Sequence, residues 1–486
     1  MRFKDLIKKL SLNNNHIQDF FVKGISCNSK DVSDKFIFVA IKGNSCNGHH
    51  FVGEAIAKGA KAVFVQSSSE NYPLKERINL IKVKDTRKVL ADLTRYFYKD
   101  PSAKIKVVGI TGTNGKTTTS YIIEAILKEA GFNPGVLGTI SYRYKNKVIP
   151  SKNTTPGPIE LQSLLKEMVD KGVDYVIIEV SSHALDQERT RGIGFSYGIF
   201  TNLTQDHLDY HKNITSYFKA KSKLFKELSS RSLAIINNDD VYGRRLKMIT
   251  PARLFSYGID NQSDILAKDI KYDLSHTEFN LITKDFKVRL KSGLIGRHNV
   301  YNILAGISFA LNERIDFEIV RKVIEEFCSV PGRLERINSE KGFSVFVDYA
   351  HTEDALRNVI ETLRPLVEKR IIVVFGCGGQ RDKTKRPRMG RVVTELADYA
   401  VITSDNPRSE NPRAIIEDIK KGIRKRNYCV IPDRFEAIKK ALTLAKQGDI
   451  VVVAGKGHEN YQILKDKVIP FNDSQVIKRC LNLKNS

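Results

Sequence analysis

A glycine-rich stretch that ends in lysine and threonines carries the strongest chemical signal in the sequence. Residues 105–120 read I-K-V-V-G-I-T-G-T-N-G-K-T-T-T-S, an apolar run that leads into Gly112, Gly115 and Lys116. Glycines permit a tight bend that aims backbone N–H groups at an anion, and the helix expected next adds the positive end of its dipole. We expect Lys116 to reach the outer phosphates of a nucleotide and the Thr117 hydroxyl to bind magnesium.

The spacing departs from the common phosphate-loop pattern G-x-x-x-x-G-K-[ST], whose first glycine would fall at Ile110. An ordinary glycine-rich turn would need neither the lysine nor the cluster of hydroxyl groups, so we expect a nucleotide site. Further along, Asn299 and Asn302 lie one turn apart at the start of an apolar helix and could face an adenine. The simpler interpretation, a capped helix start, is compatible with that role. The expected ATP-binding residues are Gly112, Thr113, Asn114, Gly115, Lys116, Thr117, Thr118, Asn299 and Asn302.

Two further motifs suggest cation ligands. The run Y-V-I-I-E (175–179) reads as a buried strand that delivers Glu179 at its carboxyl end, which predicts a magnesium ligand beside Thr117. The alternative is a glutamate that caps the following turn. In D-H-L-D-Y-H, His207 and His211 have the i, i+4 spacing of a zinc pair, but the glutamate of H-E-x-x-H is missing. A solvated helix face is the simpler interpretation of the pair.

Strands predicted at 343–347, 371–375, 399–403 and 450–454 are each followed by a polar loop. The carboxyl ends of parallel strands share one edge of a sheet, so these loops should form one ligand site. The loop Asp405-Asn406-Pro407-Arg408 precedes a helix expected to begin at Asn411 and Pro412. A plain turn would explain its position, but it would not require an arginine that can grip a carboxylate with two hydrogen bonds.

The whole chain reads as an α/β protein with a central parallel sheet and a Rossmann-like C-terminal unit. Its 486 residues suggest roughly three domains, which we place at 1–102, 103–330 and 331–486.

No apolar run is long enough to span a membrane, and the first ten residues read as an amphipathic helix. Six scattered cysteines favour reduced thiols and a cytoplasmic location. The net charge of +25 allows a nucleic-acid partner, but the lysines are spread evenly, so we expect none.

The motifs T-G-T-N-G-K-T-T, D-H-L-D-Y-H and D-N-P-R resemble the Mur ligases, a family that also resembles the folylpolyglutamate synthetases. The resemblance runs from about residue 24 to 475. It implies three domains and an ATP-dependent ligase that joins an amino acid to a carboxylate through an acyl phosphate. It also implies that Lys116, Lys221 and His207 are catalytic, and that Lys221 is carbamylated (N6-carboxylysine). The implied magnesium ligands are Thr117, Glu179, His207 and Lys221.

Within the Mur ligases the resemblance is to members that add the third peptide residue. It implies the partners ATP, UDP-MurNAc-L-Ala-D-Glu and meso-diaminopimelate, and a monomer. Residues 24–62 resemble the uridine-diphosphate segment, although Asn28, Lys30 and Asn47 replace the usual Asp, Arg and Asp. The implied contacts to this nucleotide-sugar peptide are Cys27, Ser29, Asn44, Ser45, Cys46, Asn153, Thr154, Thr155, Ser181, Gln187 and Arg189. By sequence alone, N-T-T-P (153–156) could equally cap the next helix.

In this resemblance D-N-P-R marks the enzymes that add diaminopimelate, whose second amino-acid head carries a carboxylate that Arg408 could bind. The implied contacts are Arg381, Asp405, Asn406, Pro407, Arg408, Gly455 and Glu459, with Glu459 holding an ammonium group. Gln380 and Glu353 depart from the usual Asp and Pro. The alternatives are a lysine-adding Mur ligase, a folylpolyglutamate synthetase, and a basic nucleic-acid binder with a phosphate loop.

Overall fold

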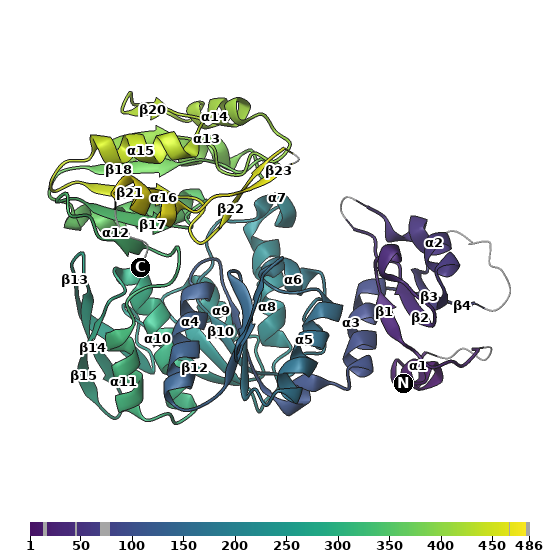
Figure 1. Ribbon diagram of the computed structural model, residues 1–486. Coiled ribbons are helices and arrows are strands. Elements are labelled where there is room, and N and C mark those ends of the chain that lie inside the picture. The colour runs from purple at the N-terminus through teal and green to yellow at the C-terminus, as the bar shows by residue number, and fades with distance from the viewer. Residues whose placement is uncertain (13–16, 44–45, 69–77, 466, 483–486) are drawn as a thin grey trace.

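The structure is a computed structural model of the chain, and it describes residues 1–12, 17–43, 46–68, 78–465 and 467–482. Figure 1 shows three α/β units, with the N-terminal unit set to one side and the C-terminal unit lying against the central one. Helix α3 (Thr86–Phe97) packs against α5 (Pro158–Asp170) and thereby joins the first unit to the second.

The N-terminal unit is a four-stranded parallel sheet in the order β1-β2-β3-β4. Its strands are β1 (Gly24–Ser26), β2 (Phe36–Val39), β3 (Ala60–Gln66) and β4 (Asn79–Val83), and its other helices are α1 (Phe3–Lys9) and α2 (Val52–Ala57). The amphipathic first helix is confirmed, because its residues Phe3, Leu6 and Ile7 are buried.

The central unit is one eleven-stranded sheet in the order β15-β14-β13-β12-β11-β10-β5-β9-β6-β7-β8. The strands are β5 (Lys106–Thr111), β6 (Pro134–Leu137), β7 (Ser141–Tyr144), β8 (Lys147–Pro150), β9 (Tyr175–Glu179), β10 (Phe195–Phe200), β11 (Leu233–Asn237), β12 (Arg253–Gly258), β13 (Ile265–Tyr272), β14 (Thr277–Thr283) and β15 (Lys287–Ser292). The helices are α4 (Lys116–Glu129), α5, α6 (Ser182–Asp186), α7 (Leu208–His211), α8 (Ile214–Lys226), α9 (Val241–Lys247), α10 (Arg297–Asn312) and α11 (Phe317–Glu326).

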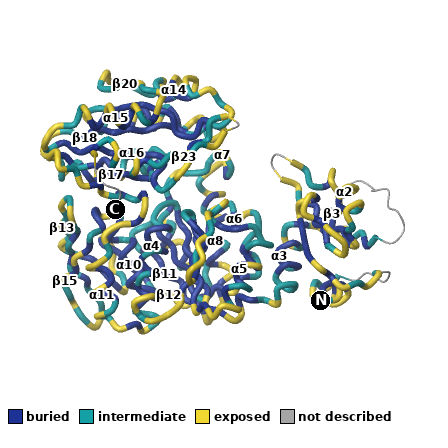
Figure 2. Tube along the Cα trace, viewed as in Figure 1, coloured by how far each residue is buried: buried dark blue, intermediate teal, exposed yellow. Residues whose placement is uncertain are grey.

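Strands β6 to β13 of this order run parallel, and the hairpins at both edges are antiparallel. Helices cover both faces, so the inner strands are buried on both sides and are almost wholly apolar. Figure 2 shows this buried interior. Strand β5 lies between β9 and β10, and the chain leaves it first to one side and later to the other. A crevice at the carboxyl ends of the strands is expected at such a switch point.

The C-terminal unit is a six-stranded sheet in the order β16-β17-β21-β18-β19-β20, parallel except for β16. Its strands are β16 (Glu335–Ile337), β17 (Ser344–Asp348), β18 (Ile371–Phe375), β19 (Tyr399–Ile402), β20 (Tyr428–Val430) and β21 (Ile450–Ala454), with a hairpin of β22 (Tyr461–Leu464) and β23 (Lys467–Pro470). The helices are α12 (Glu353–Leu363), α13 (Lys385–Leu396), α14 (Pro412–Lys420), α15 (Arg434–Leu444) and α16 (Asp473–Cys480).

The four predicted strands of this unit are confirmed to within one residue at each end, and Asn411 caps α14 as expected. Apolar side chains fill both faces of the sheet. Among the described residues, no helix combines the length and the apolarity that a membrane crossing requires.

Candidate active site

The glycine-rich loop joins β5 to α4, and two of its carbonyl groups accept hydrogen bonds from the lysine at its end. Gly112 and Gly115 have positive φ angles of 154° and 87°, and a Cβ on Gly115 would lie 2.3 Å from Asn302 Oδ1. Both positions therefore need glycine. Lys116 Nζ donates to the carbonyls of Gly112 and Thr113, each at 2.9 Å. Its ammonium thus lies inside the bend that the predicted phosphates would enter.

The segment after β10 holds this loop in place. Thr113 N–H donates to the Asn202 carbonyl at 2.8 Å, and Asn114 N–H donates to Asn202 Oδ1 at 2.9 Å. Thr118 is buried in the first turn of α4. These contacts fix the curvature of the loop.

Glu179 lies at the carboxyl end of β9 and is 1% exposed. Its carboxylate accepts hydrogen bonds from Thr117 Oγ1 and Thr139 Oγ1, each at 2.8 Å. Ser181 caps α6, so the alternative of Glu179 as a cap for that helix is wrong. Among the described residues no cation lies within ion-pair distance of Glu179, and a buried carboxylate without a cation is suited to binding one.

Lys221 is a buried residue of α8, although by composition it is one lysine among many. Its Nζ donates to the Gly112 carbonyl at 2.7 Å, the same oxygen that Lys116 contacts. Burial, and then the nearby charge of Lys116, hold the pKa of Lys221 well below its usual range. This amine therefore loses its proton far more readily than a surface lysine does.

His207 and His211 do not form a pair. His207 precedes the single turn of α7 with a positive φ of 54°, and its Nε2 lies 3.3 Å from the carboxylate of Asp206. His211 is buried, and its Nε2 lies 3.0 Å from Ser182 Oγ. The interpretation of a solvated helix face is therefore wrong for His211. Burial lowers the pKa of both histidines, so both imidazoles are neutral near pH 7.

The residues predicted to contact the sugar-peptide in the central unit lie together. Thr155 Oγ1 donates to the Glu179 carbonyl at 2.7 Å and accepts from Ser181 N–H at 3.0 Å. Arg189 donates to Gln187 Oε1 and to the Thr155 carbonyl. Asn153 and Thr154 precede them and line the adjacent cavity. Helix α5 is capped at Gly157, so N-T-T-P does not cap it.

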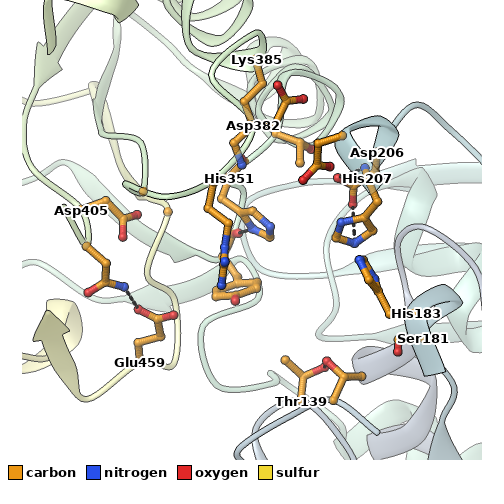
Figure 3. A pocket seen from close by; sticks show the side chains of 18 of the residues that line it. Thr139, Ser181, His183, Asp206, His207, His351, Asp382, Lys385, Asp405 and Glu459 are labelled. Carbon is orange, nitrogen blue, oxygen red and sulfur yellow. Dashed lines mark hydrogen bonds and ion pairs between the residues drawn. The ribbon is translucent and has the colours of Figure 1, made fainter. Parts of the chain in front are cut away.

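A cavity of about 1280 Å³ lies between the central and C-terminal units and is lined by residues of both. Figure 3 shows its walls, with His183, Asp206 and His207 on the central side and Asp405 and Glu459 on the C-terminal side. The predicted site residues among its walls are Asn153, Thr154, Ser181, Arg189, His207, Arg381, Asp405, Asn406, Arg408, Gly455 and Glu459. Pro407 is not among them; its carbonyl packs against Gly379.

The two arginines predicted to bind the amino acid, Arg381 and Arg408, have no acidic partner within ion-pair distance in the described part of the chain. Arg408 has a positive φ of 53°, and its Nη1 donates to the main-chain carbonyls of Gly379 (2.9 Å) and Asn406 (3.3 Å). Arg381 contacts the Gln380 carbonyl. Burial and the charge of Arg381 lower the pKa of Arg408. Two guanidinium groups without a carboxylate are suited to binding an anion.

Asn299 and Asn302 are both buried, and their amide groups bond within the protein. Asn299 Nδ2 donates to the Ile295 carbonyl at 2.9 Å, and Asn302 Nδ2 donates to Asn299 Oδ1 at 3.0 Å. Asn302 Oδ1 faces Gly115 of the phosphate loop. The pair therefore supports the loop, and contact with adenine stays a prediction.

Sequence reasoning missed two side chains that reach the phosphate loop from the C-terminal unit. Arg333 Nη2 lies 3.4 Å from Thr117 Oγ1. Asp354 accepts hydrogen bonds from Asn114 Nδ2 (3.1 Å) and Thr204 Oγ1 (2.9 Å). Arg333 lies in P-G-R-L-E-R, directly after the domain boundary placed at residue 330, and no pattern along the chain links it to Thr117.

The residues predicted to contact uridine lie in the N-terminal unit, and none of those described lines the cavity. Ser29 is buried and its Oγ donates to Glu54 at 2.8 Å, whereas Cys27 and Cys46 are exposed. Asn44 and Ser45 lie outside the described residues.

Three family models match the chain one after another. They describe the Mur ligase family, catalytic domain (residues 21–98), the Mur ligase middle domain (110–310) and the Mur ligase, glutamate ligase domain (332–457). A curated relative from Clostridium tetani, a UDP-N-acetylmuramoyl-L-alanyl-D-glutamate--2,6-diaminopimelate ligase, is 44% identical over 485 residues, which cover 99% of each chain.

Comparison with solved structures points to the same family. A structure of another UDP-N-acetylmuramoyl-L-alanyl-D-glutamate--2,6-diaminopimelate ligase is similar with a TM-score of 0.69 and 31% identity, and covers 98% of each chain. A folylpolyglutamate synthase from Mycobacterium tuberculosis has a TM-score of 0.64 at 17% identity over 76% of this chain and 92% of its own, a likeness of fold alone. From the three matched domains and the near full-length relatives, the chain belongs to the Mur ligase family.

Proposed function

We propose that this chain is an ATP-dependent ligase that adds meso-2,6-diaminopimelate to UDP-N-acetylmuramoyl-L-alanyl-D-glutamate during synthesis of the peptidoglycan precursor. The observation that carries the choice of amino acid is Arg408, whose guanidinium lies in the cavity wall with Glu459 and, among the described residues, donates only to main-chain carbonyls. A second amino-acid head offers a carboxylate to the arginine and an ammonium to the glutamate. Lysine would leave Arg408 unpaired.

In the proposed reaction the D-glutamate side-chain carboxylate attacks the γ-phosphate of ATP, and ADP leaves. The amine of diaminopimelate then attacks the acyl carbon of the resulting acyl phosphate, the bond to the phosphate breaks, and the amine loses a proton as the amide forms. Lys116 lies in the glycine-rich loop and Arg333 contacts it at Thr117. Both would offset the negative charge of the transferred phosphoryl group. Closure of the cavity between the two units would bring the substrates together.

Magnesium is the implied metal. The buried carboxylate of Glu179 and the hydroxyl of Thr117 fit a cation, and the neutral His207 could bind one. Lys221 fits only as a carbamate, because an ammonium cannot bind a cation. The described residues contain no group of three His, Cys, Asp or Glu side chains that could hold a metal, so threonine, the modified lysine and phosphate oxygens would complete the shell. Magnesium would supply positive charge at the phosphates.

The test is the initial rate of phosphate release with ATP and UDP-MurNAc-L-Ala-D-Glu, with meso-diaminopimelate or L-lysine as the acceptor. We expect kcat/KM for diaminopimelate to exceed that for lysine by at least about a hundredfold. Arg408→Ala should lower kcat/KM for diaminopimelate by about a hundredfold. Arg413→Ala, an exposed arginine in the following helix, is the matched control and should react as the wild type does.

Two outcomes would contradict this proposal. A preference for lysine would exclude the role of Arg408 while leaving the ligase intact. ATP turnover that depends on a tetrahydrofolate, with none on the nucleotide-sugar peptide, would favour a folylpolyglutamate synthetase instead.

A further inference from the structure

Behind the C-terminal wall of the cavity lies a lysine that no part of the proposed reaction uses. Lys456 follows β21 directly after Gly455, and its side chain has no exposed surface. Its Nζ donates to Glu459 Oε2 at 2.7 Å and to Asn406 Oδ1 at 3.2 Å. A fully buried ammonium is costly unless it is paired, and this one is paired with the carboxylate that faces the cavity.

The two carboxylate oxygens of Glu459 therefore have different surroundings. Oε2 accepts from Lys456 and also from Asn406 Nδ2 at 2.8 Å, so two donors occupy this oxygen. The side chain is 15% exposed and lines the cavity, as Figure 3 shows with the dashed bond to the amide. Asn406 Oδ1 is held in turn by Ile463 N–H at 2.9 Å. In the part of the chain that the structure describes, Oε1 of Glu459 has no donor and is left for a ligand.

The charges of this wall follow from these contacts. Lys456 and Glu459 cancel each other, so among the predicted diaminopimelate contacts Asp405 remains as a carboxylate, and Arg408 and Arg381 remain as guanidinium groups without an acidic ion-pair partner among the described residues. Together with Lys456, these predicted contacts therefore carry one net positive charge. Such a balance favours a head that carries a carboxylate as well as an ammonium over a head that carries an ammonium alone.

We propose that Lys456 is a specificity-determining residue: by neutralising Glu459 from inside the domain, it makes binding of the amino acid depend on a carboxylate at Arg408, and so discriminates against diamino acids that lack one. This inference rests on the proposed function. Specificity here has two sources. One is the contact of Arg408 with the substrate carboxylate, and the other is the weak attraction of the neutralised Glu459 for the ammonium of a diamino acid that lacks this carboxylate. Without Lys456, Glu459 would present a full negative charge to a substrate ammonium.

The experiment is a competition between equal concentrations of meso-diaminopimelate and L-lysine in Lys456→Met, with ATP and UDP-MurNAc-L-Ala-D-Glu. The ratio of the two products, measured by mass spectrometry, gives the ratio of the two kcat/KM values. We expect the preference for diaminopimelate to fall by about tenfold or more relative to the wild type, because a buried charge about 3 Å from a carboxylate dominates its potential. The KM for ATP should stay within about twofold, since Lys456 does not contact the phosphate loop.

Controls separate this effect from a loss of structure. Lys456→Gln keeps a polar donor without the charge and is measured in the same way if Lys456→Met does not fold. Arg370→Met breaks a cation–carboxylate pair with Asp449 at the amino ends of β18 and β21, where Arg370 donates at 2.7 Å. It should change thermal stability without changing the product ratio. In a Glu459→Gln background, Lys456→Gln should no longer alter the ratio.

An unchanged product ratio in a folded Lys456 variant, with both substrates losing rate equally, would overturn the inference and leave a structural role only. The wild-type reaction is the separate check on the proposed function. If the wild type does not join diaminopimelate to the nucleotide-sugar peptide, the function fails; if it does and the ratio does not move, the inference about Lys456 alone fails.

Discussion

Lys221 and Lys116 donate to the same carbonyl, that of Gly112, so two lysine side chains share one buried acceptor. The pKa of Lys221 is lowered by burial and by Lys116, so its amine is neutral at a pH where surface lysines are charged. Only the neutral amine reacts with carbon dioxide to form a carbamate. We therefore expect one carbamate signal in the ¹³C NMR spectrum of the protein in buffer with ¹³C-labelled bicarbonate near pH 8, and its loss in Lys221→Met.

Lys223 offers the matched control for this residue. It lies two positions further along α8 and pairs with Glu188 at 2.9 Å. Lys223→Met should keep the carbamate signal. A spectrum without any carbamate, or one unaffected by Lys221→Met, would exclude the modification of Lys221.

At the scale of elements, helix α4 has a glycine with positive φ at each end. Gly115 precedes the helix with a φ of 87° and abuts Asn302, whereas Gly131 follows it with a φ of 84° and open space around it. Alanine at either position costs about 1 kcal/mol of backbone strain. Only Gly115→Ala also displaces the phosphate loop. We expect this variant to lower kcat/KM for ATP by at least about tenfold, while Gly131→Ala lowers the melting temperature alone.

The measurements are steady-state rates, which give kcat/KM for ATP, and thermal melting curves of both variants. Equal activity in both would mean that the contact of Asn302 with the loop has no part in nucleotide binding.

For the whole molecule, the central and C-terminal units meet at the phosphate loop through Asp354. Its carboxylate accepts from Asn114 and Thr204 across the interface. Loss of hydrogen bonds to a charged acceptor costs about 1.5 kcal/mol or more, a factor of about ten in local opening. We expect Asp354→Ala to accelerate amide hydrogen exchange in residues 112–120 and 201–206 by about tenfold without nucleotide.

Glu361→Ala, on an exposed position of the same helix, is the control and should leave exchange unchanged. Unaltered exchange in Asp354→Ala would show that the interface does not depend on this carboxylate.

Local patterns in the sequence were sufficient for several features. The apolar runs of β9, β18 and β21 predicted buried parallel strands, because strands covered on both faces are uniformly apolar. The glycines and Lys116 predicted the loop, since their chemistry is local. The resemblance to Mur ligases is confirmed by the three family models and by relatives that cover nearly the whole chain.

The tertiary structure decided which residues from different units meet. No spacing along the chain places Arg333 on Thr117 or Asp354 on Asn114, because these pairs are more than 200 residues apart and form only when the two units dock. Burial likewise separated Lys221 and Lys456 from the other lysines. The sequence by itself determined the fold class, the glycine-rich loop between a strand and a helix, and the family. The desolvation of those two lysines and the cavity between the units depend on long-range packing, which alone sets the dielectric and the partners of a charge.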